Sequence, residues 1–237
     1  NYYMGFNGNS QKVAPNMAFS PDGTTGWVVT LGDLVGGKDS TFQPIFMKSS
    51  NGGVTWNAPT EISLENIPYY GSFPTLSEEL ASFWVDTIGN PVSTGRATCT
   101  FDYDITVDAN GNPHLFVVVG SASTRAEPNP MYSTYSGLVK IAVDITTDNG
   151  GLSWKALKIA PIYTFRGSFG TPDPSTGALI LMDNSTQVSR SEDGSHVFYS
   201  WVDSDTSVIG FGESTNLAPN LRIAGLRISD NYQACAK

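Results

Sequence analysis

Two similar eight-residue stretches carry most of what this sequence says about its architecture: SSNGGVTW at residues 49–56 and TDNGGLSW at residues 147–154. Each directly follows a β-rich run, at 42–50 and at 138–147. The asparagine can bond backbone amides ahead of it, glycine tolerates positive φ, and the tryptophan can fold back as an apolar plug. The residues expected to build these turns are Ser49, Asn51, Gly53, Thr55 and Trp56 in the first, and Thr147, Asn149, Gly151, Ser153 and Trp154 in the second. Both stretches therefore predict tight turns that close hairpins, with no catalytic role of their own.

A second repeated element is a turn of the Asp-Gly or Asn-Gly type between two β-rich runs. It occurs as SPDG at 20–23, DANGN at 108–112 and SEDG at 191–194. Such a turn between apolar runs is a strong short-range signal for a β-hairpin. The chain is therefore expected to contain three hairpins of one kind.

Together the two patterns divide the chain into three units of four strands. The expected strands are 12–20, 26–33, 42–50 and 56–62 in unit one, 98–107, 114–121, 138–147 and 154–160 in unit two, and 185–191, 196–204 and 220–229 in unit three. Unit three is expected to lack its fourth strand because the chain ends. Four-stranded units repeated radially are the blades of a β-propeller. The predicted fold is therefore all-β, with blades at about 7–62, 98–162 and 185–237.

The third unit is also expected to keep a decayed copy of the glycine-rich turn. RIA at 222–224 matches KIA at 140–142, and continuing without a gap places residues 229–231 over 147–149. The double glycine and the tryptophan are then lost. Because propellers close with about 4–8 blades, three blades should leave the ring open. We expect a piece of a longer chain, or a partner chain or second copy that completes the ring.

The segments between the predicted strands include one short helix and three long loops. TLSE at 75–78 is a capping box, which predicts a helix that runs to about Trp84. The loops are 63–74, 121–137 and 163–177. Because loops on a rigid scaffold usually carry recognition, these three are the expected ligand-binding segments.

Composition excludes several classes of partner. The 237 residues carry 13 basic and 22 acidic side chains, a net charge of −9 and a pI near 4.5. Such a surface repels phosphate backbones, so nucleic acid is not an expected partner. No apolar run reaches the ~20 residues of a membrane-spanning helix. The two cysteines, Cys99 and Cys235, leave a disulfide open, although unpaired thiols are the favoured interpretation.

The two glycine-rich stretches resemble Asp-boxes, the Ser-x-Asp-x-Gly-x-Thr-Trp repeats of sialidase-like β-propellers. Asn51 and Asn149 stand where that family usually has aspartate, and both keep a side-chain acceptor. The units are also similar to those of surface and secreted propeller proteins of Bacteroidetes. The resemblance implies a propeller, but Asp-boxes occur in sialidases, other glycosidases, sorting receptors and secreted binding proteins alike.

A sialidase-type site, as this resemblance implies it, needs three arginines on a substrate carboxylate, a tyrosine nucleophile with a glutamate partner, and an aspartate acid/base. The arginines of this chain are Arg96, Arg125, Arg166, Arg190, Arg222 and Arg227. The family's Arg-Ile-Pro motif normally precedes the first Asp-box. The nearest match here, at 222–224, comes late in the chain and lacks the proline. We therefore expect surface and strand-end arginines and not a complete sialidase site.

Other ionisable residues offer weaker candidates. Asp102 and Asp104 alternate with apolar residues in an expected innermost strand, so both carboxylates should share one face. They could hold a cation or ligand, or simply line a solvated channel. The DANGN turn superficially resembles a calcium loop, yet it lacks the bidentate glutamate downstream. His114 and His196 are expected at equivalent positions of successive blades, which would keep them from sharing a metal ion.

The sequence therefore favours a non-catalytic extracellular propeller that binds a glycan or a protein, or serves as a scaffold. It has no glycine-rich phosphate loop, Ser-His-Asp pattern or cysteine cluster, so neither a cofactor nor a metal is expected. One alternative is a segment of a sialidase-type glycoside hydrolase whose catalytic residues are completed outside this chain. The other is a structural component of a surface or secretion-associated assembly. The expected location is extracellular, on the cell surface or in the periplasm.

Overall fold

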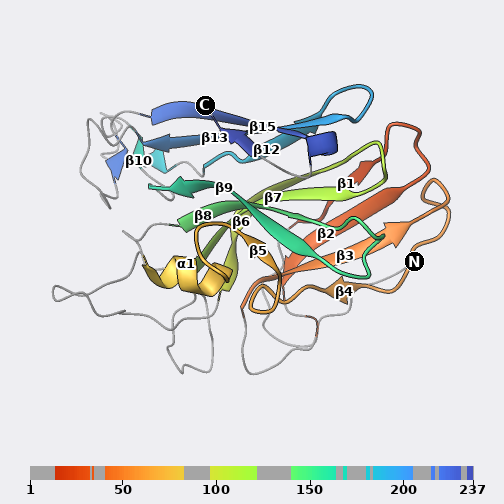
Figure 1. Cartoon of the computed structure of the whole chain (residues 1–237), viewed down its shortest axis with the longest axis horizontal. Coiled ribbons are helices and arrows are strands. Elements are labelled where there is room, and N and C mark those ends of the chain that lie inside the picture. Colours follow the sequence, from red (N-terminus) through yellow and green to blue (C-terminus); the bar gives the residue numbers. More distant parts are fainter. Residues whose placement is uncertain are drawn as a thin grey trace.

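The protein is built mostly from antiparallel β-strands (Figure 1). The computed structural model describes residues 14–32, 34, 41–82, 97–121, 140–163, 168–169, 180–181, 184–204, 215–216, 219–230 and 234–236. Within these residues the strands form four sheets, and no sheet closes on itself. The three large sheets are called the first, second and third sheet below, in the order of the chain.

The first sheet has the order β1-β2-β3-β4 and is antiparallel throughout. Its strands are β1 (Asn16–Phe19), β2 (Gly26–Gly32), β3 (Gln43–Ser49) and β4 (Thr60–Glu61). Alternate residues of β2 direct the apolar side chains of Trp27, Val29 and Leu31 to one face, where all three are buried. The four predicted strands of unit one are thus confirmed, with a much shorter last strand.

The second sheet has five strands in the order β5-β9-β8-β7-β6. They are β5 (Tyr69–Tyr70), β6 (Ala97–Val107), β7 (Pro113–Ser121), β8 (Lys140–Thr146) and β9 (Lys155–Ile162). Strand β5, which pairs in parallel with β9, had no counterpart in the sequence prediction. A two-residue strand at a sheet edge is too short to leave an alternating pattern in the sequence.

The third sheet has the order β12-β13-β15-β16. Its strands are β12 (Gln187–Arg190), β13 (His196–Ser204), β15 (Pro219–Arg227) and β16 (Ala234–Ala236). The expectation that unit three lacks a fourth strand is therefore wrong. The short helix η1 (Ile228–Asp230) turns the chain back, and β16 then pairs antiparallel with β15.

Strand pairing also corrects two alignments made between the units. Val107 pairs with Pro113, and Arg190 pairs with Val197, so His114 is equivalent to Phe198 and not to His196. The cause is the loop length, because five residues separate the paired ends at 108–112 and six do so at 191–196.

The same register corrects the expected third glycine turn. His114 pairs with Thr146, whereas Phe198 pairs with Gly225, so Leu226 is the equivalent of Thr147. The turn had been aligned three residues further along, at Ser229. The matching RIA and KIA triplets thus occupy different registers in their sheets.

Smaller elements occupy the connections. Helix α1 (Leu76–Ser82) begins with the predicted capping box: the Glu78 carboxylate accepts the Thr75 N–H, and the Thr75 hydroxyl accepts the Glu78 N–H. A three-stranded sheet joins β10 (Ser168–Phe169), β11 (Ile180–Leu181) and β14 (Thr215–Asn216), so the loop expected at 163–177 contains a strand. Among the described helices, none has the length and apolar character needed to cross a bilayer.

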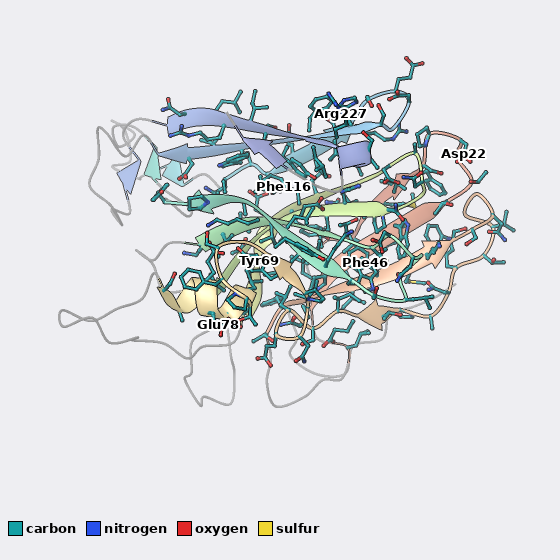
Figure 2. The ribbon with its side chains drawn as sticks, in the orientation of Figure 1. Asp22, Phe46, Tyr69, Glu78, Phe116 and Arg227 are labelled. Carbon is teal, nitrogen blue, oxygen red and sulfur yellow. The ribbon has the colours of Figure 1, made fainter. Side chains whose placement is uncertain are left out.

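The second sheet lies between the other two, and both of its faces are buried. One apolar core joins its Leu115, Val117 and Val143 to Trp27 and Phe46 of the first sheet. Figure 2 labels Phe46 in this layer and Phe116 in the layer above, between the second and third sheets. The buried residues of this second core are Phe116, Val118, Ala142, Leu157, Ile159, Ile162, Val188, Val197, Tyr199, Trp201, Ala224 and Leu226.

Candidate functional site

The first glycine turn (residues 49–56) is closed by side chains that bond its own backbone. Asn51 Oδ1 accepts the Thr55 N–H at 2.9 Å, and Asn51 Nδ2 donates to the Thr55 hydroxyl at 2.9 Å. The Ser49 hydroxyl accepts the Gly53 N–H at 2.9 Å and donates to Asn51 Oδ1 at 3.0 Å. Gly53 has a φ of +87°, a conformation that residues with a Cβ rarely adopt. Ser49, Asn51 and Thr55 thus close this turn through bonds internal to it.

The second glycine turn (residues 147–154) repeats the same bonds. Asn149 Oδ1 accepts the Ser153 N–H at 2.9 Å, and Asn149 Nδ2 donates to the Ser153 hydroxyl at 2.7 Å. The Thr147 hydroxyl accepts the Gly151 N–H at 3.1 Å, and Gly151 has a φ of +99°. Two segments about a hundred residues apart thus form the same type of turn, because they have the same residue types at the same spacing.

The tryptophans of the two turns differ in their surroundings. Trp154 stacks on Phe46 with ring centroids 4.3 Å apart and meets Trp27 edge-on at 5.6 Å. It therefore plugs the core between the first and second sheets. Trp56 packs edge-on against Phe19 at 6.1 Å and donates its indole N–H to the Gly53 carbonyl. Both tryptophans are half-buried, so the difference lies in the rings that they contact and not in their burial.

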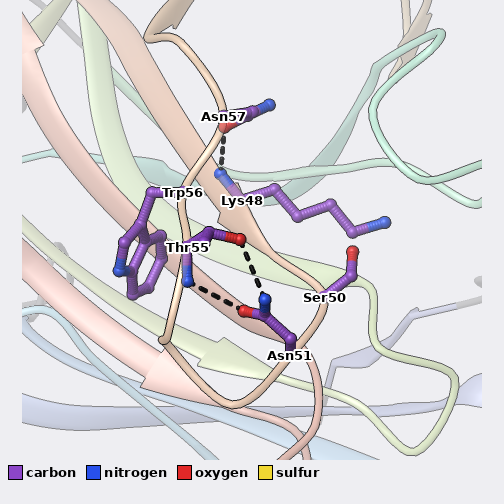
Figure 3. A pocket seen from close by; sticks show the side chains of 6 residues that line it. All are labelled: Lys48, Ser50, Asn51, Thr55, Trp56 and Asn57. Carbon is purple, nitrogen blue, oxygen red and sulfur yellow. Dashed lines mark hydrogen bonds between the residues drawn. The ribbon is translucent and has the colours of Figure 1, made fainter.

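An open depression of about 500 Å³ lies at the first glycine turn (Figure 3). Its lining residues are Lys48, Ser50, Asn51, Thr55, Trp56 and Asn57. Asn57 Oδ1 accepts the Lys48 N–H at 2.5 Å, which ties the chain after the turn to the end of β3. The depression thus combines one indole ring with two amide side chains, two hydroxyls and one ammonium group.

The three hairpin turns predicted from their Asp-Gly or Asn-Gly signals approach one another in the structure. A Cβ built on Gly194 would lie 2.5 Å from the Ala109 nitrogen and 2.8 Å from Pro21 Cγ, which shows how closely the turns of all three units meet. Ala109 N–H also donates to the Gly194 carbonyl at 3.1 Å. This convergence leaves no room for a side chain at residue 194.

Aspartates stabilise these turns by accepting hydrogen bonds from nearby N–H and hydroxyl groups. The Asp108 carboxylate accepts the N–H groups of Asn110 and Asn112 at 2.9 and 2.8 Å. At the exposed turns, hydrogen bonds from neighbouring hydroxyl and N–H groups, that of Ser20 or Ser191 first, lower the pKa of Asp22 and Asp193 to about 2. The DANGN segment is therefore a hairpin turn, as its sequence predicts. The described residues contain no group of three ionisable or thiol side chains placed to hold a metal ion.

His114 lies at the centre of a buried polar cluster between the second and third sheets. Its Nδ1 is 2.7 Å from Asp144 Oδ2, and its Nε2 is 3.6 Å from Asp108 Oδ2. The Tyr199 hydroxyl, from β13, donates to the same Asp144 oxygen at 2.7 Å. Burial by itself would lower the pKa of His114, but the charge of Asp144, the hydrogen bond to it and the nearby Asp108 carboxylate raise it to about 9. His114 and both carboxylates belong to the second sheet and its hairpin turn, and the bond from Tyr199 to Asp144 ties the third sheet to them.

The other candidate carboxylates, Asp102 and Asp104, also join two sheets. Asp102 Oδ2 accepts the Thr186 N–H at 3.0 Å, and Asp104 Oδ2 accepts the Val188 N–H at 3.0 Å. Both carboxylates lie on one face of β6, as the alternation predicts. These two N–H groups lie in the edge strand β12 and just before it. They would otherwise have no hydrogen-bond partner in a neighbouring strand.

A third ionic cluster, which the sequence did not reveal, anchors helix α1. Glu79 is almost fully buried and accepts bonds from the Tyr69 hydroxyl at 2.5 Å and the Ser72 N–H at 3.0 Å, and it pairs with Lys158. Burial would raise the pKa of Glu79, but the hydrogen bonds from Lys158 and Tyr69 lower it. Burial and the bond to Glu79 raise the pKa of Tyr69, so this tyrosine–glutamate pair does not present an activated phenolate.

The described arginines do not converge on one cleft. Arg222 and Arg227 both lie on β15, and an odd separation of five residues places them on opposite faces of the third sheet. Arg190 donates from its guanidinium to the carbonyls of Ser191 and Glu192. Arg96, Arg125 and Arg166 lie outside the described residues. The same is true of most of the predicted recognition loops 121–137 and 163–177.

Of the two cysteines, Cys99 lies within the described residues with its side chain. Its thiol is free and buried, and burial raises its pKa. A reactive cysteine needs a lowered pKa and exposure, so Cys99 is a packing residue.

No protein-family model matches this chain, and no curated protein matches it in sequence. In structure it is similar to the Hadza microbial sialidase Hz136, with 12% identity and a TM-score of 0.39 over 92% of this chain and 32% of that chain. It is also similar to a mutant β-fructofuranosidase of Microbacterium saccharophilum K-1, with 9% identity and a TM-score of 0.40 over 92% of this chain and 45% of that chain. For an inulosucrase of Halalkalicoccus jeotgali the identity is 11% and the TM-score 0.30, over 95% of this chain and 52% of that chain. This chain therefore spans less than two thirds of each, and scores at this level establish neither a shared fold nor a shared activity.

Proposed function

We propose that this chain is a segment of an extracytoplasmic β-propeller, with the three large sheets as blades and the two glycine turns as Asp-boxes. The meandering strand order of the first and third sheets supports this proposal, as does the stacking of the sheets face to face. Blades of a propeller pack in this way around a common axis. The location outside the cytoplasm is part of the proposal and rests on the resemblance of the turns.

The function proposed is binding, with the depression at the first glycine turn as the site and a neutral glycan as the ligand class. The observation that carries it is the lining itself. An indole ring offers apolar surface, while the Asn57 side-chain N–H groups and the hydroxyls of Ser50 and Thr55 suit the hydroxyl groups of a glycan. Ligand sites typically combine apolar surface with a few placed polar groups of this kind. Lys48 adds one positive charge at the rim.

Catalysis has less support within the described residues. The carboxylates of Asp104, Asp108, Asp144 and Glu79 are each engaged in bonds within the fold: Asp108 closes its own hairpin turn, and the other three bond groups on other elements. A sialidase-type reaction remains the alternative that would need residues outside the described part of the chain. A purely structural role in a larger assembly is the other alternative, and it predicts no glycan binding at all.

The binding proposal is tested by screening the whole chain on an array of neutral and sialylated oligosaccharides and titrating each hit by calorimetry. Replacing Asn57 by alanine, or Lys48 by alanine, should weaken binding of a hit by about tenfold, roughly 1.4 kcal/mol. Lys155, which follows Trp154 as Asn57 follows Trp56, provides the matched control. Lys155→Ala removes an exposed ion pair with Asp148 and should leave the affinity unchanged.

Two outcomes would overturn the proposal. One is the absence of binding to any oligosaccharide, which favours the structural role. The other is binding that both variants at the depression leave intact. Release of sialic acid from a fluorogenic sialoside would instead support the hydrolase alternative.

A further inference from the structure

Phe19, the last residue of β1, contacts the tryptophan of the depression at the first glycine turn. The Phe19 ring meets the Trp56 indole edge-on, with the ring centroids 6.1 Å apart and the ring planes at 73°. The Trp56 indole N–H donates to the Gly53 carbonyl at 3.1 Å, which ties the same indole to the turn. Trp56 lines the depression, whereas Phe19 is not among the lining residues. The aromatic ring of the depression is therefore held by a residue outside it.

Two glycines make room for the Phe19 ring. A Cβ built on Gly26, which pairs with Phe19 across the hairpin, would lie 2.5 Å from Phe19 Cε1. A Cβ built on Gly53 would lie 3.2 Å from Phe19 Cζ. Since carbon atoms in optimal contact are about 3.5–4.0 Å apart, the ring can lie here only because residue 26 has no side chain.

The other two large sheets show that the strand itself does not require a glycine at residue 26. Pro113 and Val197 are the equivalents of Gly26, because each of them pairs with the last residue before its hairpin turn. Both residues carry a Cβ and both are buried. Gly26 also lacks the positive φ that favours glycine. The absence of a side chain at Gly26 therefore serves the Phe19 ring and not the backbone.

The second glycine turn places an aromatic ring in the same way. A Cβ built on Gly151 would lie 3.2 Å from Trp27 Cη2, and Trp27 meets Trp154 edge-on at 5.6 Å. Trp27 thus occupies the place at the second turn that Phe19 occupies at the first. An edge-on ring against the turn tryptophan is a feature that both turns share.

The two tryptophans differ in a second contact. Phe46 stacks on Trp154 with centroids 4.3 Å apart and planes at 27°. In the part of the chain that the structure describes, Trp56 has the edge-on contact with Phe19 and no ring stacked on it. The stacking surface that Trp154 uses for Phe46 is therefore available on Trp56, at the wall of the depression (Figure 3).

We propose that Phe19 is the positioning residue of the glycan site, and that the Trp56 indole it holds stacks on the C–H face of a pyranose ring. This inference rests on the proposed function, because it concerns the same depression. A pyranose has C–H groups on its faces and hydroxyl groups around its rim. It therefore matches an indole bordered by the Asn57 side-chain N–H groups and the Thr55 hydroxyl. Because Phe19 fixes the indole before the ligand binds, less side-chain entropy is lost on binding.

The first measurement requires no ligand and follows the indole N–H resonances of the tryptophans by NMR. Phe19→Ala removes the ring, whereas Gly26→Ala keeps the ring and displaces it. Each variant should shift the Trp56 indole resonance and speed its exchange with water about tenfold, while the resonance of Trp201 in the third sheet stays in place. In the double variant, Gly26→Ala should add nothing to Phe19→Ala, because the new Cβ then has no ring to meet.

The second measurement is calorimetric titration with cellotetraose, maltotetraose and xylotetraose. Phe19→Ala and Gly26→Ala should each weaken the binding of such an oligosaccharide about three- to tenfold. Phe198→Ala is the matched control, because Phe198 also packs on the glycine that pairs with it, Gly225, but lies in the third sheet. It should change neither the affinity nor the Trp56 resonance.

Each result supports or overturns a defined part of the proposal. Variants that leave the Trp56 resonance unchanged overturn the positioning role, and an additive double variant overturns the route through the Phe19 ring. A shifted resonance with unchanged affinity overturns the stacking. Failure of all three oligosaccharides to bind the wild type overturns the proposed function, while the resonances still decide whether Phe19 fixes the indole. Phe19 is half-buried, so Phe19→Ala is expected to fold, and it carries the test if Gly26→Ala does not.

Discussion

Replacing His114 by glutamine is expected to remove a pH dependence of stability that the wild-type protein shows between pH 6.5 and 8. The folded protein raises the pKa of His114 from 6.5 to about 9, because Asp144 and Asp108 outweigh the cost of burial. A group whose pKa is raised on folding stabilises the protein fully below its unfolded pKa. That stabilisation is lost as the pH rises through the folded value.

The size of the effect follows from the two pKa values. A difference between 6.5 and about 9 corresponds to about 3 kcal/mol at 1.36 kcal/mol per pKa unit. By linkage, about 1.5 kcal/mol of this is lost between pH 6.5 and 8. Burial lowers the pKa of Lys140 to about 8, which adds a smaller change of opposite sign in this range. Because Lys140 is present in both proteins, the difference between wild type and His114→Gln isolates the histidine.

The assay is urea unfolding at half-unit steps from pH 6 to pH 8.5, followed by fluorescence. His196→Gln is the control, since His196 is the other of the two histidines in the chain. It bonds Ser195 at the hairpin turn and should keep the wild-type slope. A slope that survives in His114→Gln, or that is absent from the wild type, would refute the cluster as described.

His114→Gln leaves Asp144 and Asp108 buried without their cation, which can cost about 3–5 kcal/mol and prevent folding. Titration of the imidazole resonances of the wild type by NMR then provides an independent measurement. His114 should titrate near pH 9, and a value at or below 6.5 would contradict the geometry.

Three further predictions concern packing and the joints between sheets. Trp154→Ala should destabilise the protein by about 2–3 kcal/mol in chemical unfolding, because the half-buried Trp154 stacks on Phe46 at the edge of the core; a loss below 1 kcal/mol would contradict this packing. Asp104→Ala should speed amide exchange at Val188 by tenfold or more in hydrogen-exchange NMR, and unchanged protection there would argue against the carboxylate joint. Glu79→Gln should lower the free energy of unfolding at pH 7 by about 1–3 kcal/mol. Since folding lowers the pKa of Glu79, the difference in stability between wild type and variant should shrink as the pH falls below the pKa of an ordinary carboxyl group. A difference that stays constant with pH would exclude an ionised Glu79.

Much of the local structure was predictable because it depends on residues close together in the chain. The turns at 49–56 and 147–154 need only a hydroxyl, an asparagine and glycines at fixed spacing, and the bonds they form are internal. The capping box at Thr75 is local in the same way. The strands around these turns follow from the alternation of apolar residues, within a few residues at either end.

The errors arose where equivalence between units had to be judged from short matches. His114 and His196 share a residue type and a place after a turn, yet a one-residue difference in loop length gives them different neighbours. The triplets RIA and KIA match in letters and differ in register. Pairing across a sheet is decided by the whole strand and its partner, so three residues contain too little information to set it.

The candidate site shows the same division. The residues of the first glycine turn were identified from the sequence, but the depression beside Trp56 depends on which face of the sheet is left open. Trp154 has the same sequence context and is instead packed against Phe46. Only the stacking of the sheets separates the two cases.

By itself, the sequence determined that this protein is a repeat of β-hairpins closed by glycine-rich turns, because turn chemistry and alternation act over short distances. The tertiary structure alone decided which ionisable groups lie between the sheets. The neighbouring sequence does not indicate the roles of Asp144, Tyr199 and Glu79. The bonding partners of Asp144 and Tyr199 are 30 or more residues away in the chain, and Glu79 pairs with Lys158 on another element. It also decided that Phe198 and Ile223 of the third sheet stay exposed, because only the stacking order of the sheets shows which face has no neighbour.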